Sequence, residues 1–492
     1  MANENEWGSN LTFILAMIGS AVGLGNIWRY PYVLYSNGGG AFYIPYLVAI
    51  LILGIPFLIL EYGVGYNFKS SFAKAISNID KRYEFLGWFI PLALFMILVY
   101  YSCIMGWDGI YIVLSFFKGW GTDPNVFFTN TLLQSDSTTI GFIPIIAVSM
   151  LVSWLLMWFI SHKNLDEGLG KVSKILVPLL FIIMVFIVVF SLTLPGANIG
   201  LNILFNPDWS LLLDFRIWMA AFGQIIFSLS LGMSIAFTYA SYTKEGTDLI
   251  TNTISIAFAN SLFENFAALA VFSILGYMSL QSGVSVPDLV TQGTGLVFIA
   301  YPMVFNVLGD WAYILGPMFF ITVYLAGLTS FLSTIEPLSF SIQNKFGWSR
   351  SRTVTILSIV AAALSMIYAT SMGPYILGIV DGFVNQIAIL IGVVGECIVF
   401  AWIFKAEKLI KPLNSKSKTI KLGTWWLSIV KYILPLLIII VWIGGIFDLI
   451  QASTTFELIF LLGLAVGLTV FTLIFTKLSP KSDDYYTVNE RL

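Results

Sequence analysis

The sequence predicts an all-α polytopic membrane protein with twelve transmembrane helices. Of its 492 residues, 58% are apolar and only 10% are charged, whereas soluble domains carry about 25% charged residues. Apolar stretches recur along the whole chain, and lysine and arginine gather in alternate loops. This composition argues against an ordinary soluble enzyme. The net charge of −2 argues against a nucleic-acid partner, because no basic surface is available to neutralise phosphates.

A helix needs about 20 apolar residues to cross a hydrocarbon core of roughly 30 Å. Twelve stretches of the chain meet this requirement. Their predicted limits are 11–35, 41–66, 88–117, 141–160, 171–193, 214–240, 252–280, 311–343, 353–370, 374–404, 425–447 and 456–476.

The basic residues predict the orientation of these spans, because lysine and arginine are enriched in cytoplasmic loops. With both termini inside, the inner segments hold twenty of the 24 lysines and arginines. The outer loops hold only Lys118, and Arg29, Arg216 and Lys431 lie within spans or at their ends. We therefore expect both termini to be cytoplasmic.

The first span contains a run of poor helix formers, Gly19-Ser20-Ala21-Val22-Gly23-Leu24-Gly25-Asn26. Such a run favours unwinding, and unwound backbone at membrane depth is tolerated only where protein buries it or a polar cavity borders it. Its free carbonyl groups could then bind a ligand. The alternative is close helix packing, because Gly19 and Gly23 also form a GxxxG pair.

A second interruption, Ser228-Leu229-Ser230-Leu231-Gly232-Met233-Ser234, lies in the sixth span. Breaks in corresponding helices of two halves indicate an inverted-repeat transporter with a binding site near the midplane. Here helices 1–5 would match helices 6–10. The N-termini of half-helices favour an anionic group, and their free carbonyls favour a cation.

Five ionisable residues are expected at membrane depth: Glu61, Glu264, Asp381, Glu396 and Arg29. Such residues usually face the interior of the bundle and mark functional sites. The alternative for the carboxylates is hydrogen bonding to unwound backbone, which we favour for Glu61 and Glu396. Arg29 and Asp381 together suggest a gate.

Several motifs resemble the neurotransmitter:sodium symporter family, in particular its prokaryotic amino-acid transporter branch, which includes the bacterial leucine transporter. The resemblance covers spans one to ten and implies the 5+5 inverted-repeat fold with helices 1 and 6 broken in mid-membrane. The matching motifs are Asn26-Ile27-Trp28-Arg29-Tyr30-Pro31-Tyr32, the segment from Asn37 to Tyr46, Tyr100-Tyr101, the segment from Gln224 to Gly232, and Ala326-Gly327-Leu328-Thr329-Ser330.

The resemblance implies two sodium sites and no other cofactor. Site 1 would use Ala21, Asn26, Ser228 and Asn260, completed by the carboxylate of the substrate. Site 2 would use Gly19, Val22, Ala326, Thr329 and Ser330. All these ligands are neutral oxygens, which suit a monovalent cation. Without the resemblance, back-bonding to the preceding helical turn is the favoured interpretation of a Thr-Ser pair.

The resemblance also implies a substrate site between the two breaks. Relatives that transport amines carry an aspartate where this chain has Gly23, so we expect an amino acid, which brings its own carboxylate. Mostly apolar walls favour a hydrophobic or aromatic side chain. The implied residues are Ser20, Ala21, Leu24, Gly25, Ile97, Tyr101, Phe227, Ser228, Ser230, Met233, Ser330 and Thr334.

Chloride-dependent relatives carry a serine at the position of Glu264. We expect this carboxylate, with Tyr46, Gln224 and Ser228 as neighbours, to replace a bound anion and make transport chloride-independent.

Two further features of the family concern conformational change. Gly168 and Pro178 have the spacing that some relatives use to unwind helix 5, although a static kink is the alternative. Arg29, Asp381, Tyr101 and Phe227 would form the outer gate.

The inner gate is a departure from the family pattern. Relatives often pair an arginine just before the equivalent of Trp7 with an aspartate after span eight. Here Glu4 and Asn344 occupy those positions. We therefore assign no inner gate, although packing of Trp7 could contribute.

The resulting hypothesis is a sodium-coupled symporter that imports a hydrophobic or aromatic amino acid by alternating access in the cell membrane of a prokaryote. Its partners would be the amino acid, sodium ions and the lipid bilayer, and the last two spans could serve packing or homodimer contacts. The predicted organisation is a cytoplasmic N-terminal segment at 1–10, a first inverted repeat at 11–195, a second at 196–405, helices 11 and 12 at 406–476, and a cytoplasmic tail at 477–492.

Two alternatives stay open. The first is a sodium-independent exchanger or a channel on the same scaffold. The second is an intramembrane enzyme, but neither HExxH nor GxSxG occurs, and the single histidine, His162, lies in an inner loop beside Lys163. The sequence therefore favours a transporter over an enzyme.

Overall fold

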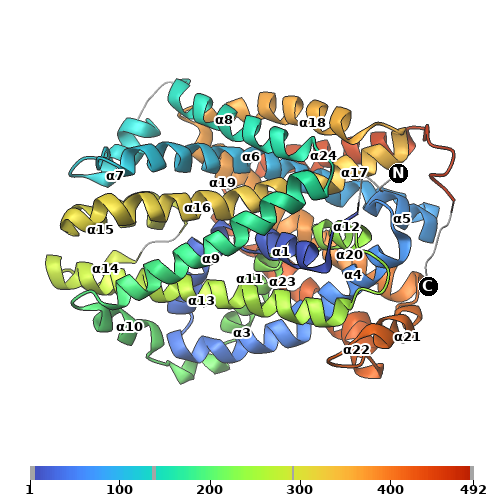
Figure 1. The fold of residues 1–492 in the computed structure, drawn as a ribbon, viewed down its shortest axis with the longest axis horizontal. Helices are drawn as coiled ribbons and strands as arrows, with labels where there is room; N and C mark the ends of the chain where they lie inside the picture. Colours follow the sequence, from blue (N-terminus) through green and yellow to red (C-terminus); the bar gives the residue numbers. More distant parts are fainter. Residues whose placement is uncertain (1–5, 136–139, 291–292, 488–492) are drawn as a thin grey trace.

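The computed structural model describes residues 6–135, 140–290 and 293–487. These residues are almost entirely helical and contain no β-strand. The long helices run roughly along one axis (Figure 1), and the first and last described residues lie at the same end of it. We call this end the inner end, following the predicted orientation, and the opposite one the outer end.

Ten continuous helical segments are long and apolar enough to cross a bilayer, and two bent pairs raise the number to as many as twelve, as predicted. Short π-helical or 3-10 turns extend several of these segments. The continuous segments contain α3 (Tyr43–Ala49), α4 (Ile55–Phe68), α6 (Glu84–Ser115), α8 (Pro144–Ser161), α9 (Lys171–Leu192), α13 (Leu249–Ser282), α16 (Ala312–Thr334), α17 (Glu336–Phe346), α18 (Arg350–Ser365), α19 (Gly373–Phe383), α20 (Ile389–Glu396), α22 (Thr424–Ser428), α23 (Leu434–Ala452) and α24 (Thr455–Lys477). Shorter helices outside them are α5 (Phe72–Ile79), α7 (Pro124–Val126), α10 (Ala197–Phe205), α14 (Val286–Leu289), α15 (Tyr301–Val307) and α21 (Glu407–Lys416).

The predicted first span is broken as expected, into α1 (Asn10–Ala21) and α2 (Leu24–Ser36), whose axes differ by 56°. The break is narrower than the predicted run of residues 19–26. Only Val22 and Gly23 lie outside the two helices, because the Asn26 side-chain oxygen accepts the Gly23 N–H at 2.9 Å and so starts α2 early.

The predicted sixth span consists of α11 (Phe215–Ser228) and α12 (Ile235–Ser241), so residues 229–234 form the second break. Ser230, Gly232 and Ser234 have positive φ angles of 51°, 68° and 56°. A larger residue than glycine has no room at position 232, because a Cβ there would lie 2.1 Å from the Val393 side chain. Before α11 the chain turns by 119°, so α10 does not continue this span.

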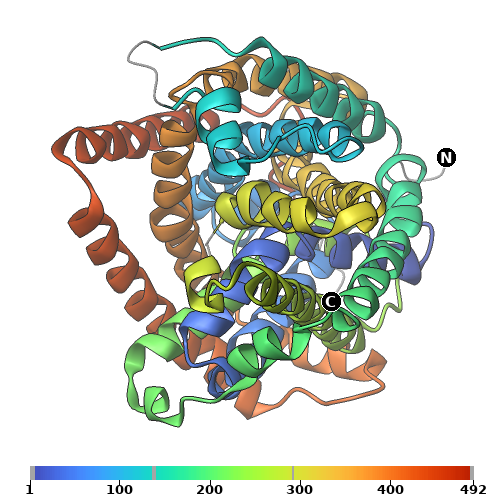
Figure 2. The ribbon, with the colours of Figure 1, turned by 90° about the vertical axis from the view of Figure 1, so that its left-hand side faces the viewer.

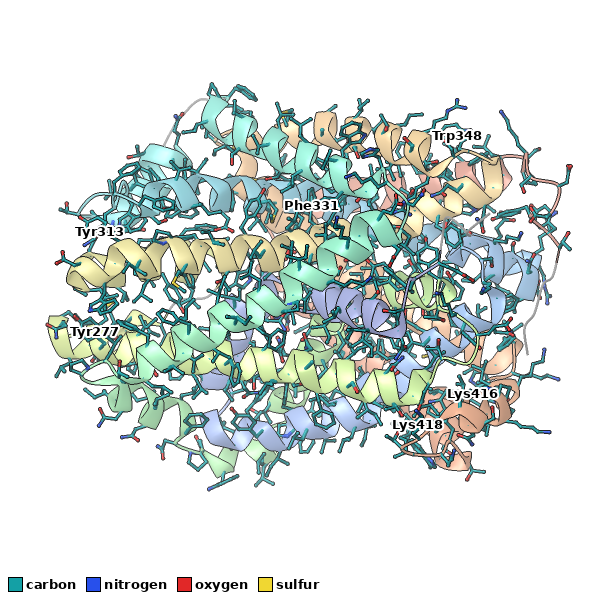
Figure 3. The ribbon with its side chains drawn as sticks, in the orientation of Figure 1. Tyr277, Tyr313, Phe331, Trp348, Lys416 and Lys418 are labelled. Carbon is teal, nitrogen blue, oxygen red and sulfur yellow. The ribbon has the colours of Figure 1, made fainter. Side chains whose placement is uncertain are left out.

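The distribution of side chains fits a bilayer around the helices. Figure 3 places Lys416 and Lys418 at the inner end and Tyr277 and Tyr313 at the outer end, with Phe331 between them. Large apolar side chains are exposed along α8, α9, α23 and α24. Figure 2 shows α23 and α24 at the periphery of the molecule. These faces match a lipid surrounding, because lipid tails cover apolar side chains without cost.

A buried ion pair closes the inner side of the helix bundle. The Arg350 guanidinium donates to both carboxylate oxygens of Glu336 and also to the carbonyls of Ser161 at 3.1 Å and Lys163 at 2.7 Å. These contacts join α17, α18 and the end of α8. Since all these partners are hydrogen-bonded, the pair fixes the relative positions of the three helices.

Candidate functional site

A cavity of about 860 Å³ lies between the two helix breaks and extends toward the outer end. All twelve residues predicted for the substrate site line it, from Ser20 in α1 to Thr334 in α16. The breaks contribute backbone and serine oxygens, whereas α6 and α16 contribute Ile97, Tyr101 and Thr334. The structure therefore brings together groups that the sequence places more than three hundred residues apart.

The cavity has further lining residues that the sequence analysis missed. Leu94 and Ser333 lie in its deep part, each three residues from a predicted member on the same helix. This spacing puts both on the face already identified and could have revealed them. Arg216, Asn385 and Asp448 also line the cavity. Asn385 lies four residues after the predicted Asp381, so the same helical spacing could have revealed it. No such spacing points to Arg216 or Asp448.

Three polar side chains of the predicted sodium site 1 meet beside the cavity and are buried. The Asn26 amide donates to the Asn260 side-chain oxygen at 2.8 Å and to the Ser228 hydroxyl at 3.5 Å. The Asn260 amide in turn donates to Ser228 at 2.5 Å. Ala21, the fourth predicted member, ends α1 and lines the cavity. The group offers several neutral oxygens and no charge of its own.

The predicted sodium site 2 joins α1 to α16. Ser330 donates across to the carbonyls of Ser20 at 3.2 Å and Gly19 at 3.5 Å. A Cβ on Gly19 would lie 3.2 Å from Thr329, so the two helices are in close contact there. The Thr329 hydroxyl donates to the carbonyls of Leu325 and Ala326 in the preceding turn. This back-bonding is the alternative to sodium binding that a threonine in a helix favours. Val22, the remaining predicted ligand, lies in the break.

Glu264 is buried among the neighbours predicted for it. Tyr46 donates its hydroxyl to one carboxylate oxygen, and the Gln224 amide donates to the other at 2.7 Å. Glu264 lies one turn after Asn260 on α13, and Asn260 bonds to Ser228. The carboxylate therefore lies within one helical turn of the neutral oxygens of the first group.

The four residues predicted for the outer gate border the cavity without closing it. The Arg29 guanidinium stacks over the Phe227 ring at 4.8 Å. Asp381 accepts from Tyr100 at 2.6 Å and from Asn385 at 2.8 Å. Among the described residues, no ion pair within 4 Å joins Arg29 to Asp381.

Tyr101 reaches the cavity with its hydroxyl group, which lies near the Leu24 backbone and the Ser330 side chain. Its hydroxyl is buried and has no hydrogen-bond partner in the part of the chain that the structure describes. A Cβ built on Gly23 would lie 3.7 Å from this oxygen. The hydroxyl is thus next to the first break and available to a ligand.

The inner end is closed around Trp7. Its ring N–H donates to the Tyr239 carbonyl at 2.8 Å and its backbone N–H to the Tyr242 carbonyl at 3.0 Å. Beside it, Glu6 pairs with Lys69 at 2.5 Å. No sequence motif indicates this pair.

Asn344 and Glu4 occupy the positions of the family's inner-gate pair. Asn344 accepts the Ser71 N–H at 3.0 Å. Glu4 lies outside the described residues.

The predicted fifth span, which consists of a π-helical turn followed by α9, is helical throughout. Gly168 lies in a π-helical turn, Asp166–Gly170, and Pro178 lies inside α9. A Cβ on Gly168 would lie 2.2 Å from the Ile160 carbonyl, so this glycine permits close packing against α8.

The family model described as the sodium:neurotransmitter symporter family matches residues 4–134 and 121–474. The chain belongs to this family. As a member, it is a sodium-dependent symporter, and sodium is its coupling ion.

Individual relatives agree with this assignment. An uncharacterised sodium-dependent transporter of Methanocaldococcus jannaschii is 38% identical over 438 residues, which cover 88% of this chain and 89% of that protein. The sodium- and chloride-dependent GABA transporter 2 of Homo sapiens is 29% identical over 446 residues, 82% of this chain and 74% of that protein.

A solved structure supports the fold. The crystal structure of MhsT in complex with L-phenylalanine aligns with a TM-score of 0.76 at 29% identity, covering 90% of this chain and 99% of that one. The symporter described here therefore has the fold that the sequence predicted.

Proposed function

We propose that this symporter imports a hydrophobic or aromatic amino acid with sodium by alternating access. The observation that carries the proposal is the cavity between the two helix breaks, which all twelve expected residues line. The phenylalanine bound by the related MhsT supports this substrate class. We also propose that the inner end faces the cytoplasm of a prokaryote, since the basic loops favour that orientation.

The charges of an amino acid match the polar groups of the cavity. Its carboxylate would accept from the Tyr101 hydroxyl and lie at the N-terminus of α2, the positive end of that half-helix. Its ammonium group would bind carbonyls freed by the breaks. The side chain would contact Ile97, Phe227 and Met233, whose apolar and adaptable surfaces suit a large apolar group.

Two sodium ions would bind at the two polar groups described above. At site 1, the Asn26 and Asn260 side-chain oxygens each accept an N–H in this structure. A sodium ion would take over these oxygens and add the substrate carboxylate as a ligand. Sodium and amino acid would therefore each raise the affinity of the other.

The transport cycle would use the outer gate described above. Arg29, Asp381, Tyr101 and Phe227 would close over the loaded cavity. The bundle that contains the first and sixth spans would then rock against the remaining helices. Unwinding of α9 between Gly168 and Pro178 would let water reach site 2, because Val177 packs against Gly19 there. Glu264 would make the cycle independent of chloride.

The proposal is tested by binding of the twenty amino acids to purified protein in sodium and in potassium. We expect apolar and aromatic amino acids to bind in sodium only. Binding that is unchanged in potassium would contradict sodium coupling and favour the exchanger. In proteoliposomes, a current far larger than the amino-acid flux would instead favour the channel.

Tyr101→Phe tests the carboxylate contact. We expect about a tenfold weaker amino-acid affinity, because a hydrogen bond to a charged group contributes roughly 1.5 kcal/mol. Scintillation proximity binding in saturating sodium measures the change. Tyr324→Phe is the control, since its hydroxyl pairs with Ser153 at 2.9 Å away from the cavity. If Tyr101→Phe and the unmutated protein have equal affinities for the amino acid, Tyr101 does not bind the substrate carboxylate.

A further inference from the structure

Beyond the last membrane helix the chain turns back over the inner end of the molecule. α24 ends at Lys477. The backbone N–H groups of Lys481 and Ser482 then both donate to the Lys345 carbonyl, at 2.8 and 3.3 Å. We call residues 481–487 the tail segment. It is anchored on the end of α17 rather than extending away from the molecule.

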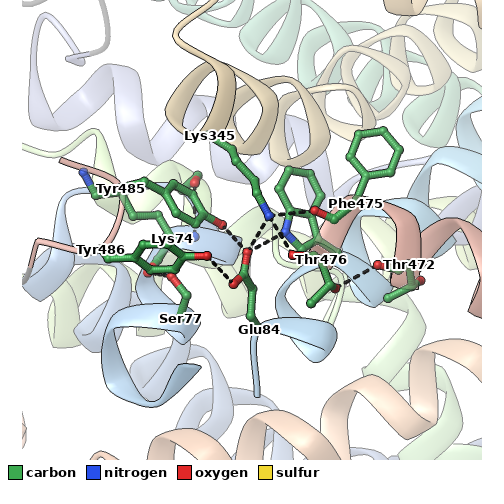
Figure 4. Close-up of polar contacts among 11 residues, drawn as sticks. Lys74, Ser77, Glu84, Lys345, Thr472, Phe475, Thr476, Tyr485 and Tyr486 are labelled. Carbon is green, nitrogen blue, oxygen red and sulfur yellow. Dashed lines mark hydrogen bonds and ion pairs between the residues drawn. The ribbon is translucent and has the colours of Figure 1, made fainter. Parts of the chain in front are cut away.

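The tail segment covers a buried ion pair. The Lys345 ammonium and the Glu84 carboxylate lie 2.7 Å apart and are almost fully buried. The Tyr485 side chain is completely buried, and its hydroxyl donates to one Glu84 oxygen at 3.2 Å (Figure 4). The Tyr486 hydroxyl donates to the other oxygen at 3.2 Å. Because a buried charge pair is stable only when its remaining hydrogen-bonding capacity is used, the two tyrosines are part of this site.

The same ion pair binds the end of the last membrane helix. Lys345 also donates to the carbonyls of Phe475 at 2.7 Å and Thr476 at 3.1 Å (Figure 4). These carbonyls belong to the C-terminal turn of α24, where the helix dipole favours a cation. The cluster therefore joins α6, α17, α24 and the tail segment.

The tail segment also holds α5, the short helix between the second and third predicted spans. Lys74 of α5 pairs with Asp484 at 2.9 Å, and the Asn78 amide donates to the Thr487 carbonyl at 3.1 Å. The Ser482 hydroxyl and the Lys74 ammonium hold the pKa of Asp484 below its usual range, so this carboxylate is ionised at neutral pH.

Helix α5 contacts both α6 and the inner half of the broken sixth span. A Cβ on Gly87 of α6 would lie 2.8 Å from the Ala73 backbone, so α5 and α6 are tightly packed. On the other side, the Phe72 ring meets the Phe237 ring of α12 edge-on, with centroids 5.2 Å apart. α12 in turn holds Trp7 through the Tyr239 carbonyl. Anything that fixes α5 therefore restrains α12 and the start of α1.

We propose that the tail segment is an intramolecular clasp that keeps the inner end closed by holding α5 against α6 and α17. Release of Tyr485 and Asp484 frees α5, and the inner halves of the two broken helices then separate more readily. The tail thus regulates how often the inner end opens. This inference rests on the proposed alternating-access function, but its test does not depend on sodium or on an amino acid.

The test is hydrogen–deuterium exchange on the full chain in lipid nanodiscs, in potassium and without amino acid. Three variants are compared with the unmutated protein: deletion of residues 481–492, Asp484→Ala, and Asp483→Ala as the matched control. Asp483 is an exposed neighbour of the same type, and among the described residues it forms no ion pair with α5. We expect the deletion to raise exchange about tenfold, and Asp484→Ala about threefold, in residues 72–79, 235–241 and 6–21, because local opening follows the loss of anchoring hydrogen bonds.

Peptides from α8 report general loosening of the fold, because the hydrogen bonds of this helix to other segments run to α16 and α18 and not to the tail segment. If the deletion raises exchange there too, Asp484→Ala alone decides the result. No change in residues 235–241 and 6–21, or an increase confined to residues 72–79, would overturn the clasp. An equal effect of Asp483→Ala would overturn it as well. None of these results would bear on sodium-dependent amino-acid binding, so failure of the clasp and failure of the proposed function remain distinguishable.

Discussion

Asn26→Ala should abolish tight sodium-dependent amino-acid binding. Asn26 caps α2 through the Gly23 N–H at 2.9 Å and holds Asn260 at 2.8 Å, so its loss removes a proposed sodium ligand and loosens the first break. Leaving buried polar partners unsatisfied costs about 1–3 kcal/mol each, so we expect sodium affinity to fall by about 100-fold or more. Titration of amino-acid binding with sodium measures this change.

The matched control for Asn26 is Asn414→Ala. The Asn414 side chain also bonds the backbone in both directions, at 2.8 and 2.7 Å to Leu422, but it lies in α21 and does not line the cavity. Its sodium dependence should equal that of the unmutated protein. Amino-acid affinity must fall together with sodium affinity in Asn26→Ala, because the two are linked at site 1. A loss of amino-acid affinity alone, with sodium affinity retained, would contradict a sodium ion at Asn26.

Glu264→Ser should convert chloride-independent uptake into chloride-dependent uptake. The carboxylate accepts from Tyr46 and Gln224 and lies one turn from Asn260, so its charge would balance a sodium ion at the proposed site 1. Removing one partner of a buried charge pair costs about 3–5 kcal/mol, and we expect uptake without chloride to fall by about 100-fold or more. The serine leaves space beside Tyr46 and Gln224, where a chloride ion can restore the charge.

Uptake into proteoliposomes, with gluconate replaced stepwise by chloride, measures this effect. Glu407→Ser is the control, because Glu407 makes its ion pair with Lys431 at the inner surface. We expect chloride to restore amino-acid uptake by Glu264→Ser and to have no effect on uptake by the control. Chloride dependence in the unmutated protein would instead show that Glu264 does not replace an anion.

Much of the site could be predicted from the sequence because its residues occur in local motifs. The poor helix formers at 19–26 and 228–234 mark both breaks, and the structure places breaks within both runs. The Asn260 and Glu264 positions follow from one helical turn on α13. The width of the first break could not be predicted, since it depends on the Asn26 cap that starts α2 at Leu24.

Other features of the site depend on contacts between distant segments. Asp381 is held by Tyr100 and Asn385 rather than paired with Arg29. Asn385 follows Asp381 by one helical turn, but no local pattern indicates Tyr100, which lies 281 residues away in the chain. The Glu6–Lys69 pair at the inner end is likewise set by the packing of α1 beside the end of α4. A charged side chain can pair with any of several residues that lie far from it in the sequence. The folded structure decides which of these residues is close enough to form the pair.

The sequence by itself determined the number of membrane spans, the two breaks and the family, because hydropathy, helix propensity and motif spacing are properties of neighbouring residues. Only the tertiary structure decided which residues pair with one another at the inner end of the molecule. There Glu84 meets Lys345 and Tyr485 across 261 and 401 residues of chain. The physical reason is that a buried charge selects its partners by proximity in space, which helix packing creates and sequence separation does not reveal.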